Sequence, residues 1–152
     1  LEVNGFTKEQ ITDPSKKSEG DIAAEFFEWL KGSPDHTTAG QNPSFDRDFL
    51  RLAAERSHLN YPLAHRTIDL HSICHAHMVW RGIVPPLENN RSALNSVKIL
   101  NYVGIPEEPR PHIALMGAKV AAEALSRLLY KKKLLPEFEQ FEIPEFKDRI
   151  SP

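Results

Sequence analysis

Apolar side chains recur at the three- and four-residue spacing of a helix in five segments, which predicts that each segment packs one face against a core. The first helix is expected near 18–31, where Ser18 and Asp21 form a capping-box start and Gly32 follows the end. The other four helices are expected at about 44–55, 70–80, 94–103 and 112–132. The inner faces are expected to carry Ile22, Phe26, Phe27 and Leu30 in the first helix and Phe45, Phe49, Leu52 and Ala53 in the second.

Only two short strands are expected, at 37–40 and 65–70, and the segment 85–90 is expected to be a loop. Two short strands cannot form a stable sheet alone, so either partner strands precede them or these segments are not strands. No repeat or domain-sized change of composition divides the chain, which predicts one domain over 1–135. Beyond this domain, acidic and aromatic residues alternate with prolines, and we expect an extended tail over 136–152.

Composition narrows the class of protein. With 40% hydrophobic and 26% charged residues among 152, the chain has the make-up of a soluble globular protein, and no apolar run approaches the roughly 18 residues that span a bilayer. Cys74 is the only cysteine, so no internal disulfide can form and a reducing cytosol is expected. The formal net charge of −2 argues against a protein that coats nucleic acid by bulk attraction, but not against an enzyme that holds a strand end through metal ions.

Two residues have positions suited to chemistry. Asp46 lies in the expected first turn of a helix that follows a strand, where a carboxylate could hold a divalent cation or simply interact with the helix dipole. His112 lies at the expected start of the last helix, just after Pro111, where an imidazole could act as a general base or as a surface cap. Taken singly, each residue favours the simpler structural interpretation.

Taken together, these segments resemble the DnaQ-like (DEDDh-type) 3′–5′ exonucleases. Asn42–Asp46, which reads Asn-x-x-Phe-Asp, resembles the second exonuclease motif of that family. His112–Ala118, which reads His-x-Ala-Leu-x-x-Ala, resembles the third motif, and Val3–Gln10 resembles a segment that precedes the helix at 18–31. The three matches occur in the family's order and cover the chain to about Tyr130.

The resemblance implies an α/β protein with the RNase H-like fold, helix-rich, with an incomplete sheet because the N-terminal strands are absent. It implies removal of nucleotides from the 3′ end of single-stranded DNA or RNA by two divalent ions, Mg²⁺ or Mn²⁺, held by four carboxylates. Asp46 would be a catalytic metal ligand and His112 the general base, while Asn42 and Phe45 would bind substrate. We expect no membrane partner, and a homo-oligomer or another protein could cover the exposed sheet edge.

Two departures from the family pattern change the expected activity. The first motif, Asp-x-Glu, is not in this sequence, and Gly117 stands five residues after His112, where the third motif has an aspartate. One carboxylate cannot hold two divalent ions, and Glu123 is too far along the helix to substitute. This chain alone is therefore expected to be inactive. The alternatives are a non-catalytic nuclease-like module that binds nucleic acid or a protein partner, and a helical interaction protein.

A second cluster of chemically capable residues lies in the segment 71–77, which reads His-x-x-Cys-His-x-His. His71, Cys74 and His75 would share a helix face, an arrangement that suits a transition metal. A fourth ligand is not evident, and Cys74 also fits a small buried residue, so a structural role is the simpler interpretation. Asp69, just before this segment, is expected either to reach the edge of the site or to cap the following helix.

Overall fold

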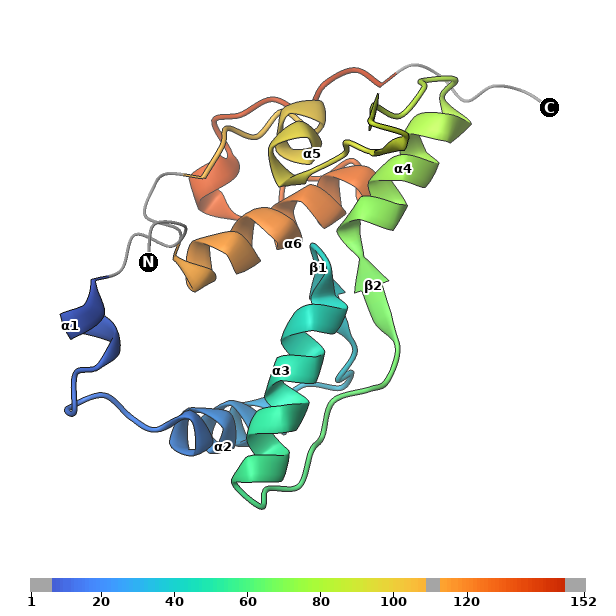
Figure 1. Cartoon of the computed structure of the whole chain (residues 1–152). Helices are drawn as coiled ribbons and strands as arrows, with labels where there is room; N and C mark the ends of the chain where they lie inside the picture. The colour runs from blue at the N-terminus through green and yellow to red at the C-terminus, as the bar shows by residue number, and fades with distance from the viewer. Residues whose placement is uncertain (1–6, 109–112, 147–152) are drawn as a thin grey trace. The chain divides into compact units, whose positions relative to one another are not determined.

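The structure, a computed structural model, describes residues 7–108 and 113–146 (Figure 1). Over these residues it is helix-rich with two small two-stranded sheets, so the coarse α/β prediction is confirmed. The elements in chain order are α1 (Lys8–Ile11), α2 (Glu19–Leu30), β1 (Thr38–Gly40), α3 (Pro43–Arg56), β2 (Thr67–Asp69), α4 (Leu70–Trp80), β3 (Leu87–Glu88), β4 (Arg91–Ser92), α5 (Ser96–Tyr102), α6 (Ala114–Tyr130) and the 3-10 turn η1 (Pro136–Phe138).

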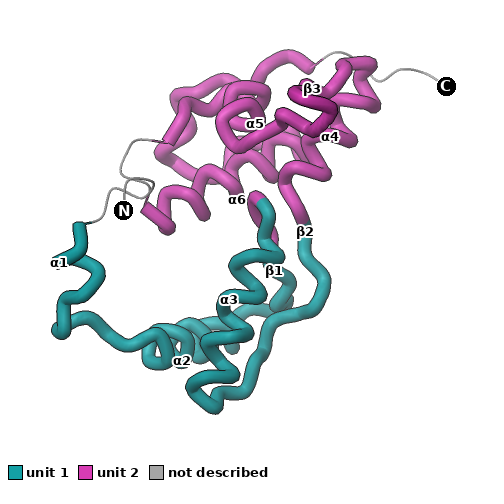
Figure 2. The backbone as a smooth tube through the Cα atoms, viewed as in Figure 1, with its two compact units in different colours: residues 1–38, 42–68 teal, residues 39–41, 69–152 magenta. Residues whose placement is uncertain are grey.

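The chain divides into two compact units, coloured separately in Figure 2. Unit 1 contains 1–38 and 42–68, and unit 2 contains 39–41 and 69–152. The chain passes between the units within β1 and β2, which form one of the two-stranded sheets. The division does not follow the boundary expected after residue 135, because the segment that follows α6 groups with unit 2.

Unit 1 is built on the packing of α2 against α3. The predicted capping box is confirmed: the Ser18 side chain accepts the Asp21 N–H, and the Asp21 carboxylate accepts the Ser18 N–H. Arg56 at the end of α3 forms an ion pair with Glu19 at the start of α2. The buried apolar core of this unit is small and consists of Ala23, Phe27, Leu30, Ala53, Ala54 and Leu63.

The predicted inner face of α3 is wrong for three of its four residues. Phe45, Phe49 and Leu52 are 67%, 54% and 42% exposed, whereas Ala53 is buried. The helix instead packs through Ala53 and its neighbour Ala54, whose small side chains allow α2 to approach closely. Helical spacing grouped Phe45, Phe49 and Leu52 on one apolar face, but α2 covers the neighbouring face that carries Ala53 and Ala54.

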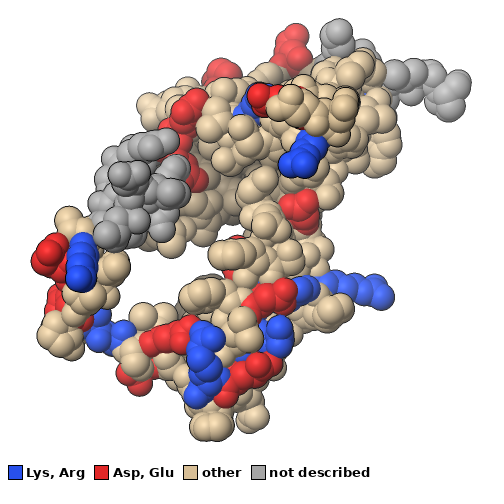
Figure 3. All heavy atoms as spheres, in the orientation of Figure 1, with Lys and Arg blue, Asp and Glu red and all other residues tan. Residues whose placement is uncertain are grey.

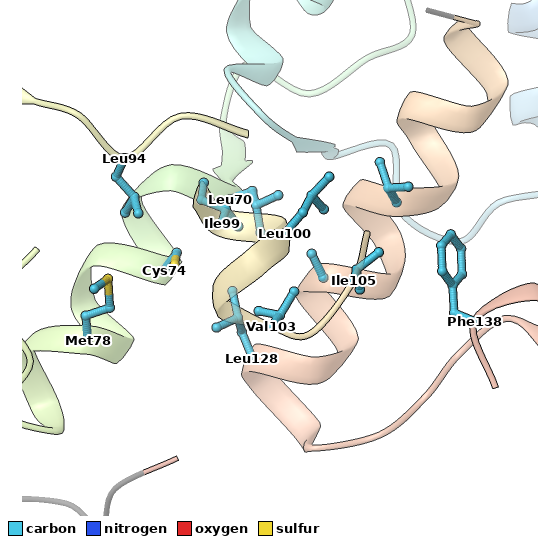
Figure 4. Close-up of a cluster of buried hydrophobic side chains, with 12 residues drawn as sticks. Leu70, Cys74, Met78, Leu94, Ile99, Leu100, Val103, Ile105, Leu128 and Phe138 are labelled. Atoms are coloured by element: carbon cyan, nitrogen blue, oxygen red, sulfur yellow. The ribbon is translucent and has the colours of Figure 1, made fainter. Parts of the chain in front are cut away.

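In unit 2, α4 and α5 pack against α6 around a larger apolar core. Asp69 caps α4 by accepting the Ser72 N–H at 3.1 Å, which is the structural one of its two expected roles. Figure 4 shows the core side chains gathered between the helices. The core consists of Leu70, Cys74, Met78, Leu94, Ile99, Leu100, Val103, Ile105, Val120, Ala124, Leu128 and Phe138.

The segment expected to be a loop at 85–90 contains a small hairpin. Leu87 pairs with Ser92 and Glu88 with Arg91 in antiparallel register. Asn89 and Asn90 form the turn with φ of 48° and 59°, the left-handed conformation that a tight hairpin requires and that asparagine tolerates well. The expectation missed this hairpin because two-residue strands carry too little alternation to detect.

A buried ion pair on α6 forms hydrogen bonds with the segment 134–142. Arg127 Nε donates to Glu123 Oε1 at 2.7 Å, and both side chains are fully buried. The second Glu123 oxygen accepts the N–H groups of Leu134 and Leu135 at 2.8 and 3.0 Å. The remaining Arg127 N–H groups donate to the backbone carbonyls of Val103, Gly104, Phe138, Phe141 and Glu142. The described part of the expected tail, 136–146, is thus held on unit 2 by the Arg127 guanidinium.

Candidate functional site

The start of α3 positions the residues of the motif-like segment Asn42–Asp46. Asn42 is the N-cap and has φ 50° and ψ 51°, a left-handed conformation that asparagine adopts more readily than most residues. Pro43 occupies the first helical turn, where its lack of an N–H costs nothing, and Ser44 Oγ donates to Asn42 Oδ1 at 3.1 Å. This tight entry places Asp46 in the first turn of the helix, as the sequence predicted.

A shallow hollow of about 350 Å³ lies along the first half of α3, wholly within unit 1. Asn42 and Phe45, the two expected substrate-binding residues, both line it, and they are joined by Ser44, Asp48, Phe49 and Leu52. The hollow therefore combines two exposed aromatic rings with an amide and a hydroxyl. Such a lining can stack a flat ring and form hydrogen bonds with its edge.

Asp46 is exposed and is not among the residues that line the hollow. Its neighbour Asp48 supplies the carboxylate of the lining, and Arg47 forms an ion pair with it at 2.8 Å. Within 7–108 and 113–146, no three His, Cys, Asp or Glu side chains gather as a metal site would require. His112 lies outside the described residues, so its expected pairing with the Asp46 site stays a prediction.

The position of Gly117, in the first turn of α6, has an acidic neighbour that sequence reasoning missed. A Cβ atom built on Gly117 would lie 3.6 Å from Glu108 Oε1. The Glu108 carboxylate therefore lies beside the position at which the resemblance led us to expect an aspartate. The nine-residue separation matches no helical or strand period, so no sequence signal links these two residues. Glu123, further along α6, is committed to the buried ion pair with Arg127.

The four residues of the His-x-x-Cys-His-x-His segment do not converge on one point. Cys74 is fully buried, and this burial raises the pKa of its thiol to about 12, so it stays protonated at neutral pH. His77 is also buried, with Nδ1 at 2.9 Å from the Tyr102 hydroxyl and its ring against Phe146. His71 is partly exposed and His75 is exposed, and their ring centroids are 6.2 Å apart.

Charge on the visible surface is mixed. Figure 3 shows acidic and basic side chains interspersed over the face that it draws, rather than one basic area. Lys133, in the lysine run after α6, forms an ion pair with Glu142 at 3.3 Å. This distribution agrees with the net charge of −2, which does not favour binding by bulk attraction to phosphates.

Comparisons with protein-family models, curated proteins and solved structures found no match for this chain. Among the described residues, no helix is both long and apolar enough to cross a membrane. Function is therefore inferred from the chain's own residues and their geometry.

Proposed function

We propose that this chain carries part of a DnaQ-like 3′–5′ exonuclease domain of the RNase H-like fold, which acts on the 3′ ends of single-stranded DNA or RNA with Mg²⁺ or Mn²⁺. The observation that carries the proposal is the ordered set of three motif-like segments, at 3–10, 42–46 and 112–118. By the resemblance, Asp46 would be one metal ligand and His112 would be the general base.

The geometry of α3 supports a role in holding a strand end. Phe45 and Phe49 are more than half exposed, and both line the hollow that begins at Asn42. Stacking of a base on an aromatic side chain contributes about 1–3 kcal/mol and tolerates any base sequence. Asn42 adds an amide that can form hydrogen bonds with a base edge or a sugar hydroxyl, and Asp46 stands exposed one residue after Phe45.

The described residues do not by themselves form a two-ion site. Two divalent cations need several carboxylates around them, whereas Asp46 belongs to no cluster of three potential ligands in the described ranges. We therefore assign no catalytic step to metal ions bound by these residues. Glu108 supplies a carboxylate beside Gly117, but it belongs to unit 2, whereas Asp46 belongs to unit 1.

This shortage of carboxylates favours a second candidate function, a nuclease-like module that binds nucleic acid without cutting it. Gly117 occupies the place of a carboxylate that the third motif normally carries. The aromatic hollow on α3 needs no metal ion to stack a base. The two functions share the same binding residues and differ only in hydrolysis.

Digestion of 5′-labelled single-stranded DNA and RNA with Mg²⁺ or Mn²⁺ tests the proposal, and it uses the complete protein that contains this chain, because this chain alone is expected to be inactive. An exonuclease shortens the labelled strand stepwise from its 3′ end, and Asp46→Ala and His112→Ala should each slow this shortening by on the order of 100-fold or more. Glu28→Ala, which removes an exposed acid from α2, is the matched control and should leave the rate unchanged. Equal degradation by Asp46→Ala and the parent would refute the exonuclease proposal.

Fluorescence anisotropy with the same labelled strands measures binding, and it distinguishes the non-catalytic module from the exonuclease. Binding without shortening, weakened several-fold by Phe45→Ala, would establish the non-catalytic module. If the complete protein neither shortens nor binds either strand, both candidate functions are lost.

A further inference from the structure

His71 and His75 lie one helical turn apart on the solvent-facing side of α4. Their ring centroids are 6.2 Å apart and their planes are inclined by 36°. His75 is exposed and His71 is partly exposed, so both rings can be reached from solvent. Neither residue belongs to the motifs on which the proposed nuclease function rests, and both belong to unit 2.

Two histidines at this spacing are suited to bind one transition-metal ion. Residues four apart on a helix have Cβ atoms about 5–6 Å apart, and this spacing serves zinc binding in helical metal sites. Tetrahedral zinc with bonds of about 2.0–2.1 Å needs its two nitrogen ligands about 3.4 Å apart. Because the His75 ring is exposed, rotation of its side chain can close the present separation without moving the helix backbone.

The surroundings of His71 orient its ring for this role. Its Nδ1 atom lies 3.9 Å from Asp69 Oδ2, and Asp69 is held in place as the cap of α4 through Ser72. This distance is too long for a hydrogen bond, but an N–H group on Nδ1 would face the carboxylate, and that tautomer leaves Nε2 as the metal ligand. Nε2 of His71 now lies 2.8 Å from the Ser92 hydroxyl of β4, which therefore marks the side from which a metal would approach.

The other two members of the segment are excluded as ligands by their positions. Cys74 faces the apolar core between the helices, and His77 contacts Tyr102 and Phe146 on the buried side of α4. The site therefore has two protein ligands, with water completing the coordination. A site of this kind is exchangeable and exposed, unlike a closed structural zinc site with four protein ligands.

We propose that His71 and His75 form a binding site for one borderline divalent transition-metal ion, such as Zn²⁺, Ni²⁺ or Cu²⁺. Imidazole nitrogen suits these ions, whereas Mg²⁺ prefers oxygen ligands, so the site is separate from any Mg²⁺-dependent activity. Metal binding at Nε2 replaces the hydrogen bond between His71 and Ser92.

Calorimetric titration of the untagged chain with Ni²⁺ and then with Cu²⁺, in buffer with excess Mg²⁺, tests the site. The tightest binding should involve one ion per chain, with Cu²⁺ bound more tightly than Ni²⁺. His71→Ala and His75→Ala should each weaken it by on the order of tenfold or more, because one imidazole loses the advantage of chelation. His65→Ala removes a solitary exposed histidine of unit 1 and should leave the affinity unchanged.

Two further variants test the geometry itself. Moving the second histidine by one residue, in His75→Ala with Ala76→His, keeps the composition but turns the imidazole away from His71, so affinity should fall as in His75→Ala. Ser92→Ala removes the competing hydrogen bond and should tighten binding by about fivefold. Helix content measured by circular dichroism should stay the same throughout, since alanine favours a helix.

The proposal is overturned if the chain binds neither ion, or if the displaced histidine binds as tightly as the original pair. It is also overturned if His65→Ala weakens binding as much as His75→Ala. None of these outcomes depends on nuclease activity, so the metal site and the proposed exonuclease function can fail independently.

Discussion

The two compact units differ in the size and make-up of their buried apolar clusters. Among the described residues, unit 2 buries twelve in one apolar cluster that includes Ile99 and Leu128, and it surrounds a fully buried Arg127 with hydrogen-bond acceptors. The apolar cluster of unit 1 has six described members, three of them alanines, and leaves the aromatic rings of Phe45 and Phe49 exposed. Unit 2 also exposes large apolar side chains, among them Trp80, Leu87 and Tyr130, so the units differ in the size of the buried cluster and not in whether large side chains reach solvent. The two exposed rings of unit 1 are distinctive because both line one hollow, where they are available for contacts with another molecule.

This difference explains where the candidate sites lie. The α3 hollow exists because that helix packs through Ala53 and Ala54 and presents Phe45 and Phe49 outward. The histidine pair of unit 2 arises in the opposite way, because α4 buries Cys74 and leaves His71 and His75 on its solvent side. In both units, the candidate binding residues are those that a helix does not use for packing.

The largest expected loss of stability is in unit 2, from the substitution Arg127→Met. This change leaves the Glu123 carboxylate buried without its cation and five backbone carbonyls without their donor, so unfolding should become easier by about 3–5 kcal/mol. Urea denaturation measures the loss, and hydrogen exchange by mass spectrometry should locate it in α6 and the segment 133–146. Arg51→Met, which breaks only exposed ion pairs on α3, should change stability by no more than about 0.5 kcal/mol.

A double variant tests whether the loss of stability comes from leaving the Glu123 charge buried without a partner. Adding Glu123→Leu to Arg127→Met removes the unpaired charge and should recover part of the lost stability. A loss below about 1 kcal/mol in the single variant would mean that the ion pair does not hold the end of the chain on α6.

The next largest effect on stability is expected in unit 1, where a buried phenylalanine can be compared with an exposed one. Phe27→Ala removes a ring that packs edge-on against Tyr61 at 6.0 Å, and it should destabilise unit 1 by about 3 kcal/mol. Phe45→Ala removes a ring that is 67% exposed and should change stability by less than about 0.5 kcal/mol. Thermal unfolding followed by circular dichroism compares the two. Similar losses in both would mean that the outer face of α3 is covered.

The effect that is smallest at neutral pH, and that grows only at alkaline pH, is a pH dependence of stability from Cys74 in unit 2. Burial raises the pKa of its thiol from 9.0 to about 12, so between these values the folded state keeps a proton that the unfolded state loses. Stability from this group is complete below pH 9 and falls by up to about 1.4 kcal/mol per pH unit as pH rises toward 12. Urea denaturation at several alkaline pH values should show a shallower decline for Cys74→Ala, and identical slopes would contradict the burial.

Much of the local structure was predictable, but the candidate sites were only partly so. Ser18 and Asp21 specified the start of α2, and the segment from Asn42 specified the turn into α3, because both act through hydrogen bonds within a few residues. Asn42 and Phe45 were expected at a binding site, and they do line one hollow. The burial of Phe45 and Phe49 was predicted wrongly, because spacing along a helix cannot say which side its neighbour covers.

The sequence by itself determined where helices begin, which residues cap them, and the order of the motif-like segments. Only the tertiary structure decided that Glu108 lies beside Gly117, and that His71 and His75 face solvent while Cys74 faces the core. The physical reason is range: capping and helical periodicity act over three or four residues, whereas burial and the meeting of distant side chains depend on how whole helices pack.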